Sequence, residues 1–121
     1  MSEARNLVVM ITHAPHDELA SVGFTIACGG MTAGATVTVF LTAAGTEIVR
    51  KKASDLVEHK PLDPLTMLVN DFLSRGGTVI ACAPCLKARA LEQDDLMDGV
   101  TISGAGPIHQ LILDGAGTLS F

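Results

Sequence analysis

The sequence contains no tryptophan and no tyrosine, and only 4 phenylalanines among its 121 residues. Proteins that bind single-stranded nucleic acid stack the bases on aromatic side chains, so this scarcity argues against such a function. Basic residues are few as well, because 8 Lys and Arg stand against 13 Asp and Glu, for a net charge of −5 at pH 7. Affinity for a nucleic-acid backbone comes from clustered positive charge, so we expect no direct nucleic-acid partner.

Long apolar runs are also missing, although 48% of the residues are hydrophobic. No stretch approaches the ~18 consecutive apolar residues that a membrane-spanning helix needs, so no membrane span is expected. The first residues, MSEARN, lack the charged-then-apolar pattern of a secretion signal. The chain has only 3 cysteines, and without an export signal these are expected to be free thiols in a reducing cytoplasm.

A chain of 121 residues can bury one hydrophobic core but not two. No internal repeat, low-complexity tract or linker divides it, so the sequence predicts a single domain over residues 1–121. The apolar content is high for so small a domain. We therefore expect further copies of the chain to cover part of its surface, as in a homo-oligomer.

Short apolar runs alternate with amphipathic segments along the chain. The runs predict five parallel strands, at residues 7–11, 36–42, 78–81, 100–102 and 118–121. The amphipathic segments predict helices at residues 17–32, 64–75, 82–89 and 104–114, with a short helix at 47–52. Asp63 and Ser103 are expected to cap the second and the last of the long helices. This alternation predicts an α/β fold with a parallel sheet covered by helices on both faces.

Two of the cysteines stand where the third strand ends and a helix begins, in the stretch CAPCLKAR at residues 82–89. Pro84 suits the start of a helix, where unpaired N–H groups and the helix dipole favour a thiolate. Arg89 lies one helical turn after Cys85 and adds positive charge. Because the thiolate is the nucleophilic form, a reactive sulfur is predicted at Cys82 or Cys85. Cys28 lies among apolar residues of a predicted helix and is interpreted as packing.

Chemistry in parallel α/β folds gathers beyond the carboxyl ends of the strands. The loop at residues 12–17 follows the first strand, so it is expected near the cysteine motif. His13 in this loop is a candidate base or orienting group, and the alternative is a strand-end histidine bonded to backbone. The other histidines, His16, His59 and His109, are expected to be ordinary surface residues.

Five segments together resemble the DsrE/DsrF-like family of small sulfur-relay proteins. They are THAP at 12–15, VTVFLT at 37–42, GG at 76–77, CAPCLKAR at 82–89 and TLSF at 118–121. The most specific of them is the cysteine after the third strand, with an arginine seven residues later. The resemblance covers nearly the whole chain. It implies a three-layer α/β/α sandwich around a five-stranded parallel sheet, and assembly into trimers or hexamers.

The resemblance also implies a sulfurtransferase that carries sulfane sulfur as a cysteine persulfide between donor and acceptor proteins. The carrier cysteine of the family matches Cys82, and a basic residue of the following helix matches Arg89. Cys85 is an additional cysteine, so the expected catalytic residues are Cys82, Cys85, Arg89 and His13. We expect Cys82 to accept sulfur and Cys85 to resolve it through an internal disulfide. The rival assignment, in which Cys85 alone carries sulfur, is favoured by local electrostatics. No cofactor and no metal are expected.

Two other functions are open at the same motif. A thiol–disulfide oxidoreductase is one, since Cys-Ala-Pro-Cys resembles a thioredoxin active site, although no tryptophan precedes it. A non-catalytic, oligomeric protein that binds a small molecule or acts in regulation is the other. No nucleotide-binding glycine motif follows a strand. Zinc would need two further ligands, and no second Cys-x-x-Cys supplies them.

Overall fold

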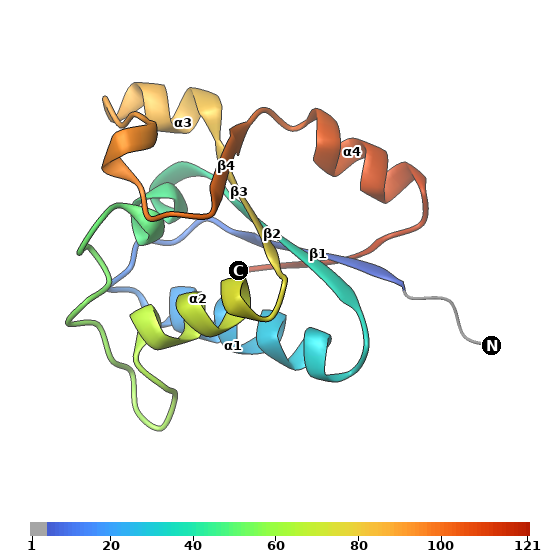
Figure 1. The fold of residues 1–121 in the computed structure, drawn as a ribbon, viewed down its shortest axis with the longest axis horizontal. Coiled ribbons are helices and arrows are strands. Elements are labelled where there is room, and N and C mark those ends of the chain that lie inside the picture. The colour runs from blue at the N-terminus through green and yellow to red at the C-terminus, as the bar shows by residue number, and fades with distance from the viewer. Residues whose placement is uncertain (1–4) are drawn as a thin grey trace.

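The computed structural model describes residues 5–121, in which strands and helices alternate (Figure 1). The strands are β1 (Asn6–Ile11), β2 (Thr36–Leu41), β3 (Thr78–Cys82), β4 (Val100–Ser103) and β5 (Gly117–Ser120). The helices are α1 (Glu18–Thr32), α2 (Leu65–Ser74), α3 (Ala83–Ala88) and α4 (Gly106–Leu113), with the 3-10 helices η1 (Ala43–Val49) and η2 (Gln93–Asp95). All five predicted strands are confirmed. Residues 1–4 lie outside the described residues. They belong to the predicted domain and to the N-terminal segment in which no secretion signal was expected.

The five strands form one sheet in the order β4-β3-β2-β1-β5, and every neighbouring pair is parallel. The register aligns the ends of the three central strands, because Leu41 pairs with both Ile11 and Ala81. Parallel strands need crossover connections, and the segments between these strands run over the faces of the sheet. The segments that follow β1, β2 and β3 therefore begin at one common edge.

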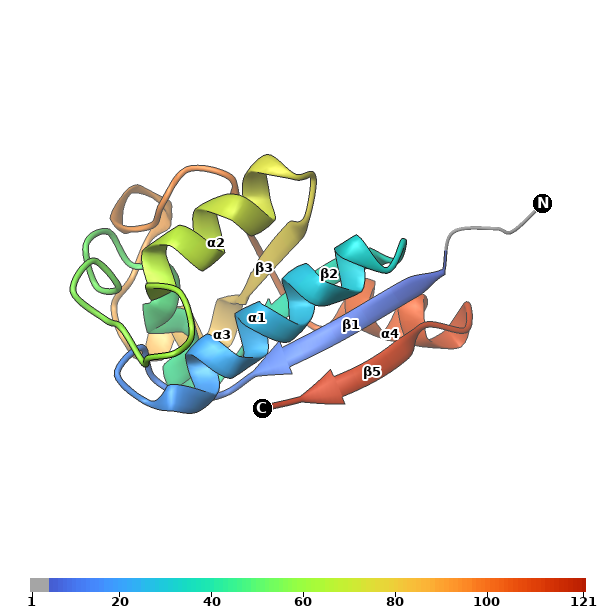
Figure 2. The same cartoon turned by 90° about the horizontal axis from the view of Figure 1, so that it is seen from below.

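The larger hydrophobic core lies between the sheet and the helices α1 and α2 (Figure 2). Phe24 of α1 and Phe72 of α2 are fully buried there, and their rings meet edge to face with centroids 5.9 Å apart. Aromatic pairs in this geometry add to the free energy gained from burial of their area. The predicted buried face of α2 is confirmed by Leu65, Leu68, Val69 and Phe72.

Helix α4 covers the opposite face of the sheet, which completes the expected α/β/α sandwich (Figures 1 and 2). Val8, Phe40 and Ile80 of the strands form a smaller core there with Ile108 of α4. This second layer is thin, because Leu113 of α4 remains 80% exposed. Within residues 5–121, no helix combines the length and the apolar character of a membrane span.

The predicted cap of α2 was wrong. Pro64, and not Asp63, is the N-cap residue, and no side chain caps the helix. The backbone N–H of Leu65 instead donates a hydrogen bond to the Val57 carbonyl at 3.0 Å. The loop before α2 thus supplies the acceptor that a cap side chain otherwise provides.

Two further local predictions were wrong. Ser103 does not cap α4, because it pairs with Cys82 as the last residue of β4 and the N-cap residue of α4 is Ala105. The short helix expected at residues 47–52 is instead the 3-10 helix η1, which begins at Ala43 directly after β2. Pairing with β3 holds Ser103 in extended backbone, which is a tertiary effect that a local pattern does not contain.

Substitution of Phe72 by alanine tests the core. We expect Phe72→Ala to lower the free energy of unfolding by about 3–5 kcal/mol, because it empties a fully buried ring site. Met67→Ala on the same helix is the matched control: Met67 is 56% exposed, and its loss should change stability by less than ~0.5 kcal/mol. Urea denaturation measures both. Similar small losses in the two variants would contradict the role of Phe72 as a core anchor.

Candidate functional site

The cysteine motif begins on the sheet itself. Cys82 is the last residue of β3 and also the N-cap residue of α3, so strand passes directly into helix. Pro84 lies in the first turn of α3, and buried Leu86 holds the helix against the rest of the molecule. Cys85 follows in the same first turn. This arrangement places both thiols at the edge where β1, β2 and β3 end.

The three cysteines differ in burial and environment, and all are free thiols. Cys28 is buried in α1, and its thiol donates a hydrogen bond of 3.7 Å to the Leu68 carbonyl. Burial raises the pKa of Cys28, and the charge of Asp71 raises it further against the lowering effect of Arg75. Cys28 is therefore held in the protonated, less reactive form, in agreement with its interpretation as packing.

Cys82 and Cys85 are only partly buried, and their two sulfurs interact. The hydrogen bond from the Cys82 thiol is the largest cause that lowers the pKa of Cys85, and burial opposes it. The backbone N–H of Ala43 and the charge of Arg89 lower this pKa further. Burial first, and then the interaction with Cys85, raises the pKa of Cys82. The pair thus favours a thiolate on Cys85 with the proton kept on Cys82.

The segment that contains Ala43, the start of η1, lies closely against the end of β1. Ala43 has a φ of +49°, in the left-handed region that residues other than glycine rarely adopt. Two residues later, a Cβ at Gly45 would collide with the carbonyl oxygen of Ile11. The first turn of η1 is therefore strained and tightly seated, and strain of this kind often gathers at functional sites.

Arg89 connects the motif to η1. Its Nη1 donates a hydrogen bond of 3.2 Å to the Cys85 carbonyl, and its Nε lies 3.8 Å from Oε2 of Glu47. The Arg89 and Glu47 side chains are 32% and 36% exposed, so solvent weakens their attraction and the pair adds little to stability. Its consequence is positional: the guanidinium stays beside Cys85.

His13 lies in the loop after β1 and is partly buried. Its Nδ1 is 3.4 Å from the hydroxyl of neighbouring Thr12, and within residues 5–121 no hydrogen bond joins His13 to either motif cysteine. The structure thus brings Cys82, Cys85 and Arg89 together. A role of His13 as base stays a prediction.

The remaining histidines differ from one another. His16 and His109 are exposed, as expected. His59 is more than a surface residue, because its Nδ1 lies 3.3 Å from the hydroxyl oxygen of fully buried Ser21. This contact gives the buried hydroxyl a polar partner, which a buried polar group requires.

Sequence reasoning missed two groups of the site, the backbone N–H of Ala43 and the carboxylate of Glu47. Both belong to η1, whose 3-10 geometry leaves no amphipathic pattern to detect. Gly45 was the available signal, since a glycine just after a strand often marks a close approach of two backbone segments.

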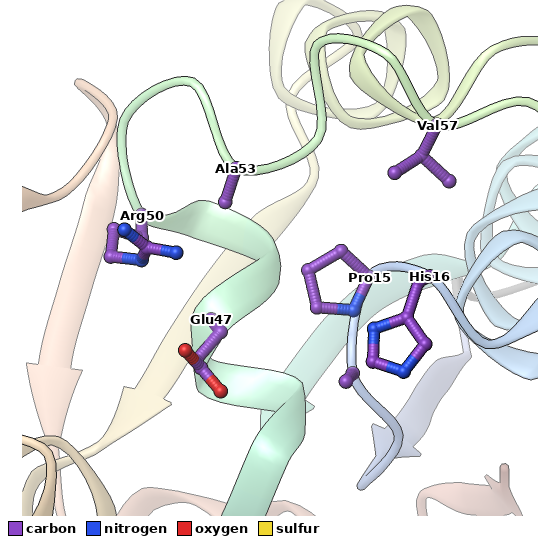
Figure 3. Close-up of a pocket in the computed structure, with 7 residues that line it drawn as sticks. Pro15, His16, Glu47, Arg50, Ala53 and Val57 are labelled. Carbon is purple, nitrogen blue, oxygen red and sulfur yellow. The ribbon is translucent and has the colours of Figure 1, made fainter.

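A cleft of about 240 Å³ opens between η1 and the loop after β1 (Figure 3). Glu47 and Arg50 lie on one side of it, and Pro15 and His16 lie on the other. The lining residues are Ala14, Pro15, His16, Glu47, Arg50, Ala53 and Val57. Glu47 therefore takes part both in the cleft wall and in the ion pair with Arg89. In the part of the chain that the structure describes, no group of three or more His, Cys, Asp or Glu is placed to hold a metal.

The reactivity of the two thiols as a function of pH tests this arrangement. We expect Cys85 to reach half of its maximal alkylation rate at a pH below the ordinary thiol value, because its thiolate is favoured. Cys82→Ala removes the hydrogen bond that lowers the pKa of Cys85 most, so it should move the midpoint of alkylation to higher pH. Arg89→Gln should move it less. Lys87→Gln is the control, since Lys87 is exposed on the same helix and is not among the groups that shift the pKa of Cys82 or Cys85. Faster alkylation of Cys28 than of Cys85 would contradict the assignment.

Comparisons with known proteins show relatives over most of the chain. The chain is 30% identical to an uncharacterized protein of Methanocaldococcus jannaschii over 105 residues, which is 86% of both chains. It is 28% identical to an uncharacterized protein of Methanopyrus kandleri over 107 residues, 88% of this chain and 83% of the relative.

Two solved structures share the fold. The ychN protein of E. coli superposes with a TM-score of 0.80 at 17% identity, over 97% of this chain and 99% of its own. A protein of unknown function from Methanobacterium thermoautotrophicum superposes with a TM-score of 0.77 at 18% identity, over 98% and 100%. At these identities the likeness concerns the fold alone. A model of the DsrE/DsrF-like family matches residues 5–121. The chain, with its five-stranded parallel sheet and the cysteine at the end of β3, belongs to the DsrE/DsrF-like family.

Proposed function

We propose that this protein is a sulfur-relay protein, a sulfurtransferase that carries sulfane sulfur as a persulfide at the Cys82-x-x-Cys85 motif. The observation that carries the proposal is the pair of partly exposed, interacting thiols in which the pKa of Cys85 is lowered. A lowered pKa supplies the thiolate that attacks sulfur. Membership of the DsrE/DsrF-like family agrees with sulfur chemistry at this place.

Loading begins with attack of the Cys85 thiolate on the outer sulfur of a donor persulfide, R–S–SH. A new S–S bond forms at Cys85, the S–S bond of the donor breaks, and the donor leaves as the thiolate R–S⁻. The sulfane sulfur keeps its oxidation state, so no oxidant or reductant is needed. The charge of Arg89 and the N–H of Ala43 favour the anionic forms of this sulfur, as they favour the Cys85 thiolate.

This order of events gives Cys85 the role of carrier, whereas family position favours Cys82. Electrostatics supports Cys85, because a sulfur of lowered pKa is both more often ionised and the better leaving group. Cys82 then resolves the persulfide when no acceptor is present. Its thiolate attacks Sγ of Cys85, a Cys82–Cys85 disulfide forms, and HS⁻ leaves. A cellular thiol would reduce that disulfide again, which fits a reducing, cytoplasmic location.

A thiol–disulfide oxidoreductase is the second candidate. The observation that favours it is the interaction between the two motif sulfurs, since a disulfide needs the same two atoms close together. The two functions differ in what the protein carries: a relay holds an extra sulfur atom, and an oxidoreductase loses two hydrogens.

The mass of the intact protein after exposure to a persulfide donor tests both candidates. We expect the wild type to gain sulfur that a reductant removes. Cys85→Ser should not load. Cys82→Ser should load and keep its sulfur longer, because the resolving thiol is gone. Cys28→Ser is the matched control and should behave as wild type.

Three other results of the mass measurement would contradict parts of this proposal. Loading in Cys85→Ser but not in Cys82→Ser would reverse the two roles in favour of family position. Formation of a disulfide with no gain of sulfur would favour the oxidoreductase. A wild type that neither loads sulfur nor forms a disulfide would favour a binding protein.

We also propose that the protein works as a homo-oligomer, a trimer or hexamer as in its family, with sulfur donor and acceptor proteins as partners. The support is the apolar surface on α4 and β5, where Leu113 is 80% and Leu119 is 44% exposed. β5 is also an edge strand, with unpaired backbone groups along one side.

Light scattering tests the assembly. Leu113→Asp should reduce the particle mass, because it places a charge in the apolar surface. Leu56→Asp is the control, since Leu56 is 99% exposed in the turns that follow η1 and belongs to neither α4 nor β5. A wild type that is monomeric at micromolar concentration would contradict the proposal, and so would dissociation caused by the control alone.

A further inference from the structure

The cleft beside the motif has charges that the relay step leaves unused. Arg50 is exposed at the cleft wall, and within residues 5–121 its guanidinium pairs with no carboxylate. Glu47 lies on the same side of the cleft (Figure 3), and its Oε2 is 3.8 Å from Arg89, which leaves Oε1 for another donor. The carboxylate of Glu47 in η1 and the guanidinium of Arg50 at the C-cap of η1 are thus three residues apart.

Apart from His16, the other side chains that line the cleft are apolar. Pro15 is buried, and Ala14, Ala53 and partly buried Val57 add small aliphatic surfaces. A volume of about 240 Å³ is below the ~300–1,000 Å³ of sites for drug-sized ligands. The cleft therefore suits the end of a small molecule, with an anionic group for Arg50 and a cationic group for Glu47.

The cleft and Cys85 are joined by η1. The backbone N–H of Ala43, at the beginning of η1, lowers the pKa of Cys85, and Glu47 lies four residues later. With a rise of ~2 Å per residue in a 3-10 helix, these two positions are about 8 Å apart along the helix axis. Arg89 provides a second connection, since it contacts both Glu47 and the Cys85 carbonyl.

From this arrangement we propose that the cleft binds the amino-acid head group of a low-molecular-weight γ-glutamyl thiol, and that this thiol takes the sulfur from Cys85. The head-group carboxylate pairs with Arg50 and its ammonium with Glu47. The side chain and amide of the γ-glutamyl unit cover the distance to the cysteine. This inference rests on the proposed sulfur relay and names an acceptor for it.

The transfer is an exchange between a thiolate and a persulfide. The thiolate of the acceptor attacks the outer sulfur of Cys85–S–SH, the S–S bond at Cys85 breaks, and Cys85 leaves as its thiolate. The acceptor becomes R–S–SH, so one thiolate is consumed and one is formed. No electron leaves or enters the pair of reactants.

Three thiols of equal length test the proposal. γ-Glutamylcysteine carries the whole head group, 4-aminobutanoyl-cysteine lacks its carboxylate, and glutaryl-cysteine lacks its ammonium. Loss of sulfur from the loaded protein is followed by intact mass at increasing thiol concentration. We expect half-saturation by γ-glutamylcysteine at a concentration about tenfold lower than by either analogue, because each lacks one charge-assisted contact.

The Arg50→Gln variant should erase the advantage of γ-glutamylcysteine over 4-aminobutanoyl-cysteine. Lys51→Gln is the matched control, because Lys51 is the exposed neighbour and does not line the cleft. If the three thiols unload the protein with the same concentration dependence, the cleft proposal is overturned while the relay stands.

Direct binding separates the two proposals if the protein accepts no sulfur. S-Methyl-γ-glutamylcysteine cannot react, and its binding is measured by calorimetry with wild type, Arg50→Gln and Lys51→Gln. Binding that only Arg50→Gln loses supports the cleft independently of the relay. Absence of binding to the wild type overturns the cleft proposal.

Discussion

The candidate functional site depends on the parallel register of β1, β2 and β3. Ile11, Leu41 and Ala81 stand side by side, fully buried, at the level where the three strands end. Backbone hydrogen bonds between parallel strands fix this level, and a slip of one residue would turn each buried side chain to the other face. The loop after β1, the helix η1 and the cysteine motif therefore meet at one edge because the sheet core is well determined.

Close backbone contact between η1 and the end of β1 fixes the position of η1. The absent side chain of Gly45 allows η1 to approach the end of β1, and the left-handed Ala43 turns the chain at the same point. The resulting N–H beside Cys85 belongs to the main chain, so no side chain has to be ordered to supply it. A fixed donor of this kind costs no reorganisation when negative charge develops on sulfur.

The sequence was sufficient for the fold and for part of the site. Apolar runs identify the strands because burial on both faces leaves no polar alternation, and the cysteines could be placed because β3 is one of these runs. Asp63 was mispredicted as a cap because the Val57 carbonyl in the preceding loop accepts the hydrogen bond of the Leu65 N–H. Ser103 was mispredicted because its pairing with Cys82 of β3 holds it in extended backbone. The pair of Glu47 with Arg89 joins segments 42 residues apart, so no local pattern could indicate it.

The two cysteines show why position and reactivity need separate arguments. Cys82 ends a strand and Cys85 lies in the following turn, and from sequence alone either could be the nucleophile. The pKa values of the two thiols distinguish them, because burial raises the pKa of Cys82 and neighbouring hydrogen-bond donors lower the pKa of Cys85. Such surroundings exist only after the chain has folded.

The direct passage of β3 into α3 has a mechanical consequence. No loop residue separates the last strand residue, Cys82, from the first helical residue, Ala83. A sulfur atom bound at this motif would be held by rigid secondary structure on both sides, with no flexible segment to move it. In the proposed relay, donor and acceptor would therefore have to bind at the same fixed point one after the other.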